Sequence, residues 1–315
     1  MKQYLKPFLL GPLLCIGQSL YAQATFHHTT SAANVSGSKT IIDNLFLNDK
    51  PNAILFIMPK WNDGGDSYAC TNYRLNAAVQ YNTTQKRWMI CNEKQSEAMP
   101  VGVTFNVLVA PIGNPNYFIQ SGPPGPWPHL QFIDNALTNG KPKALLLVTQ
   151  NLGTDVAPAA YNDNSQLTAY ADGKWAIGNN NYFYPGCPSQ SVSMPPGAKF
   201  NVMVMKKGVV PGFPNGSAYM HETSPANTSY ILQHATFLKG AAVSANSTFI
   251  FATPSWGTTQ EERPPGYPIA MQNNDSPVAA WFGGTYTNDK WSVVNTNGIP
   301  FRKGVLLHVV AIKKI

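Results

Sequence analysis

The stretch Ile42–Leu55, IDNLFLNDKPNAIL, recurs without a gap as Ile133–Leu146, IDNALTNGKPKALL, 91 residues later (133 − 42 = 91). Self-similarity at a fixed spacing is the signature of a repeat architecture, so this stretch decides how the whole chain is read. Downstream, the segment around Trp88, KRWMICN, returns as GKWAIGN around Trp175 and as DKWSVVN around Trp291. The chain therefore contains three copies of one unit.

The two ends of each copy support this division. The copies close on MPVGVTFNV at 99–107, MPPGAKFNV at 194–202 and IPFRKGVLLHV at 299–309. The openings of copies one and three agree, as FHHTTSAAN at 26–34 and YMHETSPAN at 219–227, whereas copy two has a Pro/Gly run instead. Short runs of alternating apolar residues separated by Gly, Asn, Asp and Pro predict strands joined by turns.

We therefore expect an all-β fold with three tandem repeats of about 90–100 residues, each a small β-sandwich or barrel-like unit. The expected boundaries are 25–111, 116–207 and 217–315, the last with an insert near 261–280. The alternative is a single β body with the three units around a pseudo-threefold axis. Separate tandem units are preferred, because each copy has enough strands for a core of its own.

Composition agrees with a folded β-protein. Of the 315 residues 43% are hydrophobic and 12% are charged, with 25 Gly and 26 Pro, which excludes disorder and long amphipathic helices for most of the chain. The net charge of +7 comes from 22 basic and 15 acidic residues. The basic residues of the chain form only short clusters, so we expect no nucleic-acid partner.

The first 24 residues have the three parts of a secretory signal peptide. Lys2 and Lys6 precede an apolar run at 8–16, and Ala22-Gln23-Ala24 follows as a cleavage site. The apolar run is about half the ~20 residues of a membrane-spanning helix. We expect a secreted or periplasmic chain that starts near Thr25 and has no transmembrane segment.

Three cysteines remain in that mature chain. In an oxidising compartment Cys70 and Cys91 are close enough in sequence to form a local disulfide, which leaves Cys187 unpaired. Their spacing matches no zinc motif, so we expect no metal site.

Catalytic motifs give no candidate. The chain lacks Gly-x-Ser-x-Gly, a phosphate loop and a dinucleotide fingerprint, and Gly65-Asp66-Ser67 reads as a turn. His221-Glu222 is not followed by the second histidine of a zinc protease helix. We therefore expect no catalytic residue and no cofactor.

Sugar binding has the best physical case among specific functions. Stacking needs an aromatic face beside neutral amide and hydroxyl groups, and the loops of this chain supply both, although loop aromatics equally serve as packing lids. The candidate ligand-binding residues are Trp61, Asn62, Tyr68, Trp127, Trp256, His28 and His221.

One family shares these motifs. The residues that carry the likeness are His28, Asn34, Ile42-Asp43, Pro51-Asn52-Ala53, Trp61-Asn62, the WxIxN segment at 88–92 and the MPxGxxFNV segment at 99–107. They resemble a bacterial secreted tandem-repeat family of unknown function, most strongly in copy one. The resemblance implies an exported all-β repeat protein and carries over no activity, cofactor or catalytic residue.

The leading hypothesis is a secreted, non-enzymatic binding or envelope-associated protein that recognises a glycan or a cell-surface component through its loops. One alternative is a secreted hydrolase with an unrecognised site. The other is a structural surface protein whose repeats self-associate.

Overall fold

The structure is a computed structural model that describes residues 24–61, 73–179, 192–228, 235–238, 247–258, 277–282 and 290–314. Within these ranges the chain forms strands and no helix. Consequently the described residues offer no helix that is long and apolar enough to span a membrane.

The strands follow the order of the three sequence repeats. Repeat 1 contains β1 (Ala24–Thr29), β2 (Val35–Ser36), β3 (Lys39–Ile42), β4 (Leu55–Trp61), β5 (Ala77–Asn82), β6 (Arg87–Asn92) and β7 (Thr104–Val109). Repeat 2 contains β8 (Tyr117–Ser121), β9 (Leu130–Phe132), β10 (Leu145–Thr154), β11 (Gln166–Ala171), β12 (Lys174–Asn179) and β13 (Lys199–Met205). Repeat 3 contains β14 (Gly216–Glu222), β15 (Ala235–Phe237), β16 (Thr248–Thr258), β17 (Val278–Phe282), β18 (Trp291–Asn295) and β19 (Leu306–Lys313).

These strands form three sheets with the same internal order. Sheet A is β1-β7-β4-β17-β18-β15, sheet B is β8-β13-β10-β5-β6-β3-β2, and sheet C is β14-β19-β16-β11-β12-β9. Each sheet thus takes the opening, closing and apolar strands of one repeat and the hairpin and preceding strand of another. The junctions β4–β17, β10–β5 and β16–β11 are parallel in all three cases.

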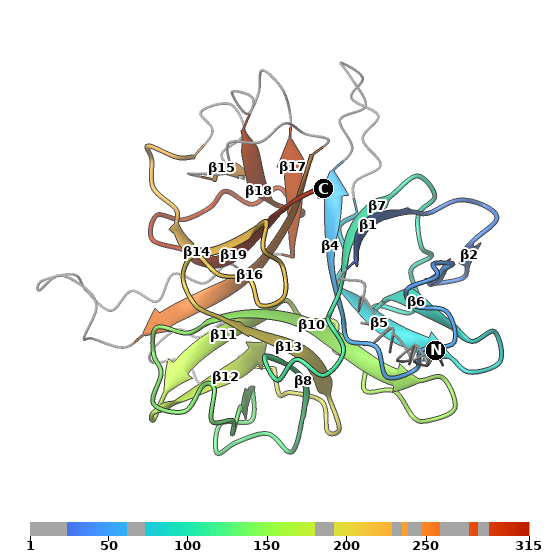
Figure 1. Ribbon diagram of the computed structural model, residues 1–315, viewed down its shortest axis with the longest axis horizontal. Helices are drawn as coiled ribbons and strands as arrows, with labels where there is room; N and C mark the ends of the chain where they lie inside the picture. Colours follow the sequence, from blue (N-terminus) through green and yellow to red (C-terminus); the bar gives the residue numbers. More distant parts are fainter. Residues whose placement is uncertain are drawn as a thin grey trace, which may run out of the picture.

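The all-β class and the three β-rich units are confirmed. Between the two arrangements considered above, the strand order selects the single pseudo-threefold body, because every sheet is shared by two repeats. The repeats occupy three sectors around a common centre: blue and cyan at the right, green at the bottom, orange and red at the upper left (Figure 1).

The apolar strands β4, β10 and β16 meet at this centre and are joined by a cyclic set of hydrogen bonds. In each bond a backbone amide donates to a side chain of the next repeat. The three donor residues occupy equivalent positions in the three repeats, and so do the three acceptor residues. The bonds run from Ile57 N to Thr149 Oγ1 (3.3 Å), from Val148 N to Thr253 Oγ1 (3.1 Å) and from Ala252 N to Met58 Sδ (3.1 Å).

A second ring of contacts starts from the closing strands. The Asn of the FNV motif, or His308 in repeat 3, reaches a backbone group on the apolar strand of another repeat. The contacts are Asn106 Nδ2 to Ile250 O (2.9 Å), Asn201 Nδ2 to Leu55 O (2.8 Å) and His308 Nδ1 to Leu146 N (3.1 Å) and O (3.3 Å). Because each contact joins two repeats, the three repeats are held as one body.

Replacing Asn201 by leucine tests this ring. Asn201 is fully buried, donates to Leu55 O and accepts from Asn151 Nδ2 at 2.8 Å, so the change leaves two buried groups without a partner. We expect a loss of about 3 kcal/mol in the free energy of unfolding, measured with urea. The same change at exposed Asn52 should have little effect. An equal effect of the two substitutions would contradict the role of the ring.

Candidate functional site

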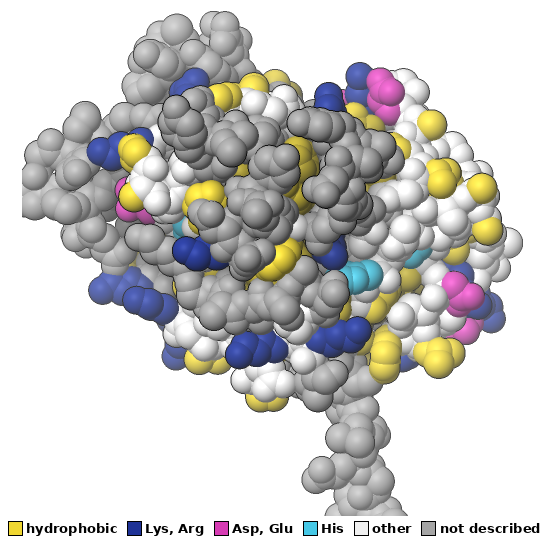
Figure 2. Space-filling view, turned by 90° about the horizontal axis from the view of Figure 1, so that it is seen from above, with side chains coloured by type: hydrophobic (Ala, Val, Ile, Leu, Met, Phe, Trp, Pro, Cys, Tyr) yellow, Lys and Arg dark blue, Asp and Glu magenta, His cyan; other side chains and the backbone are white. Residues whose placement is uncertain are grey.

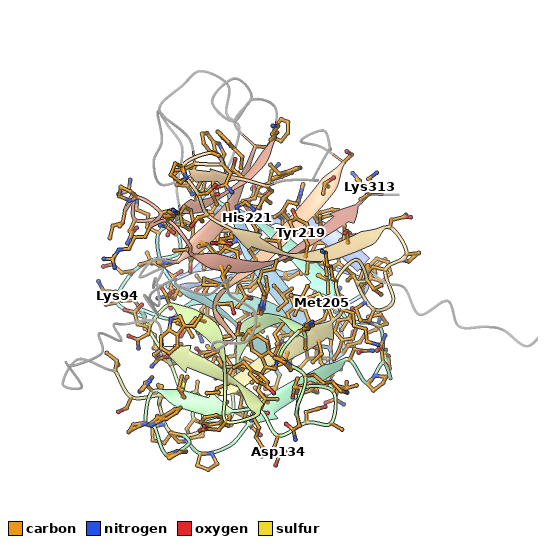
Figure 3. All side chains as sticks on the ribbon, turned by 90° about the vertical axis from the view of Figure 1, so that its left-hand side faces the viewer. Lys94, Asp134, Met205, Tyr219, His221 and Lys313 are labelled. Atoms are coloured by element: carbon orange, nitrogen blue, oxygen red, sulfur yellow. The ribbon has the colours of Figure 1, made fainter. Side chains whose placement is uncertain are left out.

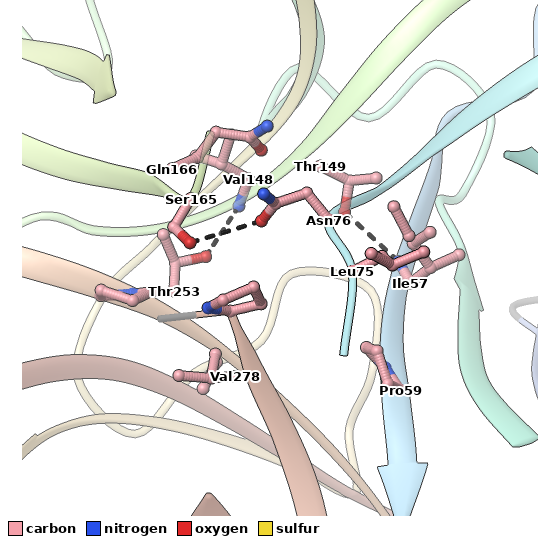
Figure 4. A pocket seen from close by; sticks show the side chains of 14 residues that line it. Ile57, Pro59, Leu75, Asn76, Val148, Thr149, Ser165, Gln166, Thr253 and Val278 are labelled. Carbon is pink, nitrogen blue, oxygen red and sulfur yellow. Dashed lines mark hydrogen bonds between the residues drawn. The ribbon is translucent and has the colours of Figure 1, made fainter. Parts of the chain in front are cut away.

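A small pocket lies on the central axis, where the apolar strands meet the first residues of the hairpins (Figure 4). It has a volume of about 90 Å³ and is lined by neutral side chains, including Asn76, Thr149, Ser165, Gln166 and Thr253. Ser165 Oγ donates to Asn76 Oδ1 at 3.4 Å, which links repeats 2 and 1 across the pocket. This volume suits a few water molecules. Among the described residues that line the pocket, none carries a charge.

Two of the predicted aromatic residues lie at sheet C, each beside another aromatic ring. Trp127 belongs to repeat 2 and packs against Phe132, with the two rings 6.0 Å apart. Trp256 of β16 belongs to repeat 3 and lies 6.4 Å from the ring of His129. We call Trp127, His129, Phe132 and Trp256 the Trp127 cluster. Its residues come from segments more than a hundred positions apart, so the sheet junction creates it.

Local backbone geometry presents the Trp127 cluster at the surface. Leu130 N donates to Trp127 O at 2.9 Å, and Gly125 N donates to Leu130 O at 2.8 Å, so the Pro/Gly run folds back over β9. A Cβ atom on Gly125 would lie only 2.6 Å from the Phe132 ring, which explains why glycine is required there. Trp127 is 43% exposed, whereas Trp175 of the same repeat is fully buried. The cluster therefore has one accessible indole, the partly buried rings of Phe132 and Trp256, and the buried ring of His129.

Trp61 lies elsewhere, on sheet A, where its ring is 5.8 Å from that of Trp281. Trp61, Leu152 and Trp256 occupy equivalent positions, each three residues after a member of the first central ring. Pseudo-symmetry therefore separates Trp61 from Trp256 on two different sheets. The candidates Asn62 and Tyr68 lie outside the described residues.

The two candidate histidines are buried and hold the opening turns. His28 Nε2 is 2.8 Å from Thr40 Oγ1, and that hydroxyl donates to Asn34 Oδ1 at 3.1 Å. Burial lowers the pKa of His28 to about 4, so its ring is neutral at pH 7. His221 on β14 (Figure 3) makes the same 2.8 Å contact, with Thr236. The structure thus gives these histidines a structural role and does not bring them to the Trp127 cluster.

Repeat 2 replaces this arrangement with two glutamines. Gln120 occupies the register position of His28, opposite the closing-strand phenylalanine, and donates to Phe132 O at 3.2 Å. Gln131 takes the place of the threonine and donates to Gly122 O at 2.6 Å. An amide chain therefore ties the Pro/Gly run to sheet C in the repeat that lacks the histidine.

The structure describes one of the three predicted mature-chain cysteines. Cys91 is a buried free thiol in the structure, and the disulfide with Cys70 that the spacing allowed involves a residue without a described position. Cys70 and Cys187 lie outside the described residues. Cys91 is the last residue but one of β6, where its side chain packs with Ala78, Met89 and Leu152.

One buried acid was missed by the sequence analysis. Glu93 follows β6, and its carboxyl accepts from Asn162 N at 2.9 Å and from Gln166 Nε2 at 3.1 Å, both in repeat 2. Burial raises the pKa of Glu93 well above its usual range. Its partners show that it joins repeats 1 and 2. Among the residues with a described position, no three His, Cys, Asp or Glu side chains gather as a metal site would require.

Charged side chains are spread over the visible face in small groups. Figure 2 shows Lys and Arg side chains in several separate places, with hydrophobic and neutral polar side chains between them. Asp134 and Lys174 form an exposed ion pair of 3.2 Å, and hydrogen bonds from Asn139 and Lys174 lower the pKa of Asp134. Such surface pairs contribute little to stability.

Comparison with family models gives one match. The model described as domain of unknown function (DUF7452) matches residues 17–109 and again residues 78–183. Together the matches span 167 of the 315 residues (183 − 17 + 1 = 167), more than half of the chain. The second match begins at Ala78 in β5, so it contains both strands of the parallel junction β5–β10. A comparison with curated proteins finds no match.

Proposed function

The chain belongs to the family of the domain of unknown function DUF7452. We propose that it is an exported bacterial protein that binds glycans without catalysis. The observation that carries the proposal is the Trp127 cluster. Repeats 2 and 3 contribute one indole each to this cluster, Trp127 beside Phe132 and Trp256 beside His129.

The composition of the Trp127 cluster indicates the class of ligand. It combines one accessible indole with neutral groups, and burial lowers the pKa of His129, which keeps that imidazole uncharged at pH 7. An amphipathic ring with a polar tip suits a partner that is apolar on one side and hydroxylated on the other. A neutral saccharide has that character, because its ring presents C–H groups on a face and hydroxyls on the edge.

A glycan array followed by titration calorimetry tests the proposal, with residues 25–315 as the sample. We expect Trp127→Ala to weaken binding at least about tenfold, the loss of about 1.4 kcal/mol that marks an anchoring residue. Trp61→Ala is the matched control, since it removes a tryptophan from sheet A and should leave the affinity unchanged. The absence of binding at high micromolar concentration, or equal losses in both variants, would rule out the cluster as the site.

A second candidate, self-association, is favoured by a different surface. A groove of about 640 Å³ lies between the Ile-Asp turn of repeat 1 and the linker to repeat 2. Its rim exposes Leu45 (86%), Phe46 (39%) and Ile112 (68%), and adjacent exposed apolar side chains often mark contact surfaces. Light scattering against concentration distinguishes the two candidates: growth that Ile112→Asp abolishes supports assembly, and a constant monomer mass excludes it.

A further inference from the structure

Three reactive side chains meet on sheet B. Strand β6 lies between β3 and β5, and Cys91 of β6 pairs with Lys39 on one side and with Ala78 on the other. Cross-strand partners share a face, and so do residues two apart in a strand, so Lys39, Cys91 and Gln80 point to the same side. Lys39 Nζ donates to Gln80 Oε1 at 2.9 Å, and Cys91 Sγ lies 3.9 Å from the same oxygen.

The other two repeats show that the fold does not require these polar groups. The positions equivalent to Lys39, Gln80 and Cys91 are Leu130, Ala169 and Gly178 in repeat 2 and Ala235, Trp281 and Val294 in repeat 3. Repeat 1 thus buries a thiol and a carboxamide beside an ammonium group where the others bury apolar residues. Gln80 is 3% exposed and Cys91 is fully buried. Burial of polar groups costs free energy, so their grouping here needs another reason.

We propose that Lys39 and Gln80 become joined by a side-chain amide bond, with Cys91 as the nucleophile that forms it. In the first step the Cys91 sulfur attacks the Gln80 side-chain carbonyl carbon. The carbon–sulfur bond forms, the carbon–nitrogen bond breaks, and the thiol proton passes to the departing nitrogen. The products are free ammonia and a thioester between Cys91 and Gln80. The Lys39 ammonium hydrogen bond to Gln80 Oε1 polarises the carbonyl for this attack.

The second step restores the thiol. Lys39 gives one proton to the released ammonia, and its free amine attacks the thioester carbonyl. The new carbon–nitrogen bond forms as the carbon–sulfur bond breaks. One of the two amine protons passes to the Cys91 sulfur, and the other stays on the amide nitrogen. The sum converts a carboxamide and an ammonium group into a secondary amide and an ammonium ion, with no oxidant or reductant.

The reaction is slow and happens once per chain. Burial raises the pKa of Cys91 to about 12, so the sulfur keeps its proton until the attack. A single turnover suffices for a structural bond, and holding the groups in contact replaces the high concentration that a bimolecular reaction would need. The product ties β3 to β5 across β6, in the half of sheet B that repeat 1 supplies.

Intact-mass measurement and peptide mapping of the folded mature chain test this proposal. We expect the wild-type mass to fall below the sequence mass by one ammonia, with the peptides that contain Lys39 and Gln80 recovered as one linked species. Lys39→Arg, Gln80→Leu and Cys91→Ser should each restore the sequence mass, and circular dichroism checks that each variant folds. Lys50→Arg, at an exposed position outside sheet B, should keep the loss.

Three results would overturn it. The full sequence mass with unlinked peptides, after prolonged incubation of the wild type, excludes the bond. The second is a mass loss in which the Cys91 thiol is blocked and hydroxylamine frees it, because this would mean that the reaction ends at the thioester and the amide does not form. A linked Cys91→Ser chain means that the thiol is not the nucleophile.

Discussion

Trp175→Ala is expected to lower the free energy of unfolding of the entire molecule by about 4 to 5 kcal/mol, in a single transition. Trp175 is fully buried, donates from Nε1 to Lys141 O at 3.0 Å and packs against His308 of repeat 3 at 5.3 Å. Its loss leaves a large cavity between two repeats. Urea unfolding followed by far-UV circular dichroism measures the change.

The matched control is Trp127→Ala, which removes the exposed tryptophan of the same repeat and should change stability by less than about 1 kcal/mol. The number of transitions carries the structural information. If Trp175→Ala produced a separate early transition with about a third of the signal, the repeats would unfold independently, and the shared sheets described above could not be the main stabilising contacts.

Acid is expected to destabilise the wild-type chain by roughly 3 kcal/mol more than His308→Asn between pH 7 and pH 4. Burial lowers the pKa of His308 to about 4, while an unfolded histidine has a pKa near 6.5. The unfolded chain therefore binds more protons in this window. The contribution of His308 is complete above about pH 6.5 and is lost as the pH falls through 4.

The surroundings of His308 favour this interpretation. Its ring contacts the Leu146 backbone, the Thr168 hydroxyl at 3.5 Å and the Trp175 indole, none of which carries a charge. Asparagine is the residue that repeats 1 and 2 place at this position, so the variant keeps the ring of contacts.

The measurement is the difference in urea unfolding free energy between wild type and variant at pH 7, 5.5 and 4. The difference removes the contribution of Glu93, whose raised pKa has the opposite effect on stability. A constant difference across the series would show that His308 does not titrate in this way.

The repeats and the all-β class were readable from the sequence because both depend on local patterns, the recurring IDN and FNV motifs and the period-two alternation. The sharing of each sheet by two repeats could not be predicted from the sequence. Alternation tells which face of a strand is buried. It does not tell that β5 pairs with β6 of its own repeat on one side and with β10 of repeat 2 on the other, because the second pairing depends on contacts between distant segments. Pairing partners of this kind leave no local signal.

The site was partly predictable for the same reason. Trp127 and Trp256 were identified singly as aromatic candidates, but only the β16–β11 junction brings Trp256 of repeat 3 beside His129 of repeat 2. His28 and His221 were misleading, since a histidine shared by two repeats indicates a common contact as readily as a ligand. The contact made by the asparagine of the FNV motif could have been predicted. This asparagine recurs at positions 106 and 201, and in both repeats it lies within a strand predicted to be buried.

The parallel pair β4–β17 of sheet A can form only late in the synthesis of the chain. Strand β4 ends at Trp61, and its partner β17 begins at Val278, so the ribosome adds more than two hundred residues before that edge is covered (278 − 61 = 217). Until then the first repeat carries an open strand edge, the kind of surface that attracts other chains. The pairing that completes sheet A therefore forms last. A chain truncated within repeat 3 before β17 would leave the edge of β4 in repeat 1 exposed.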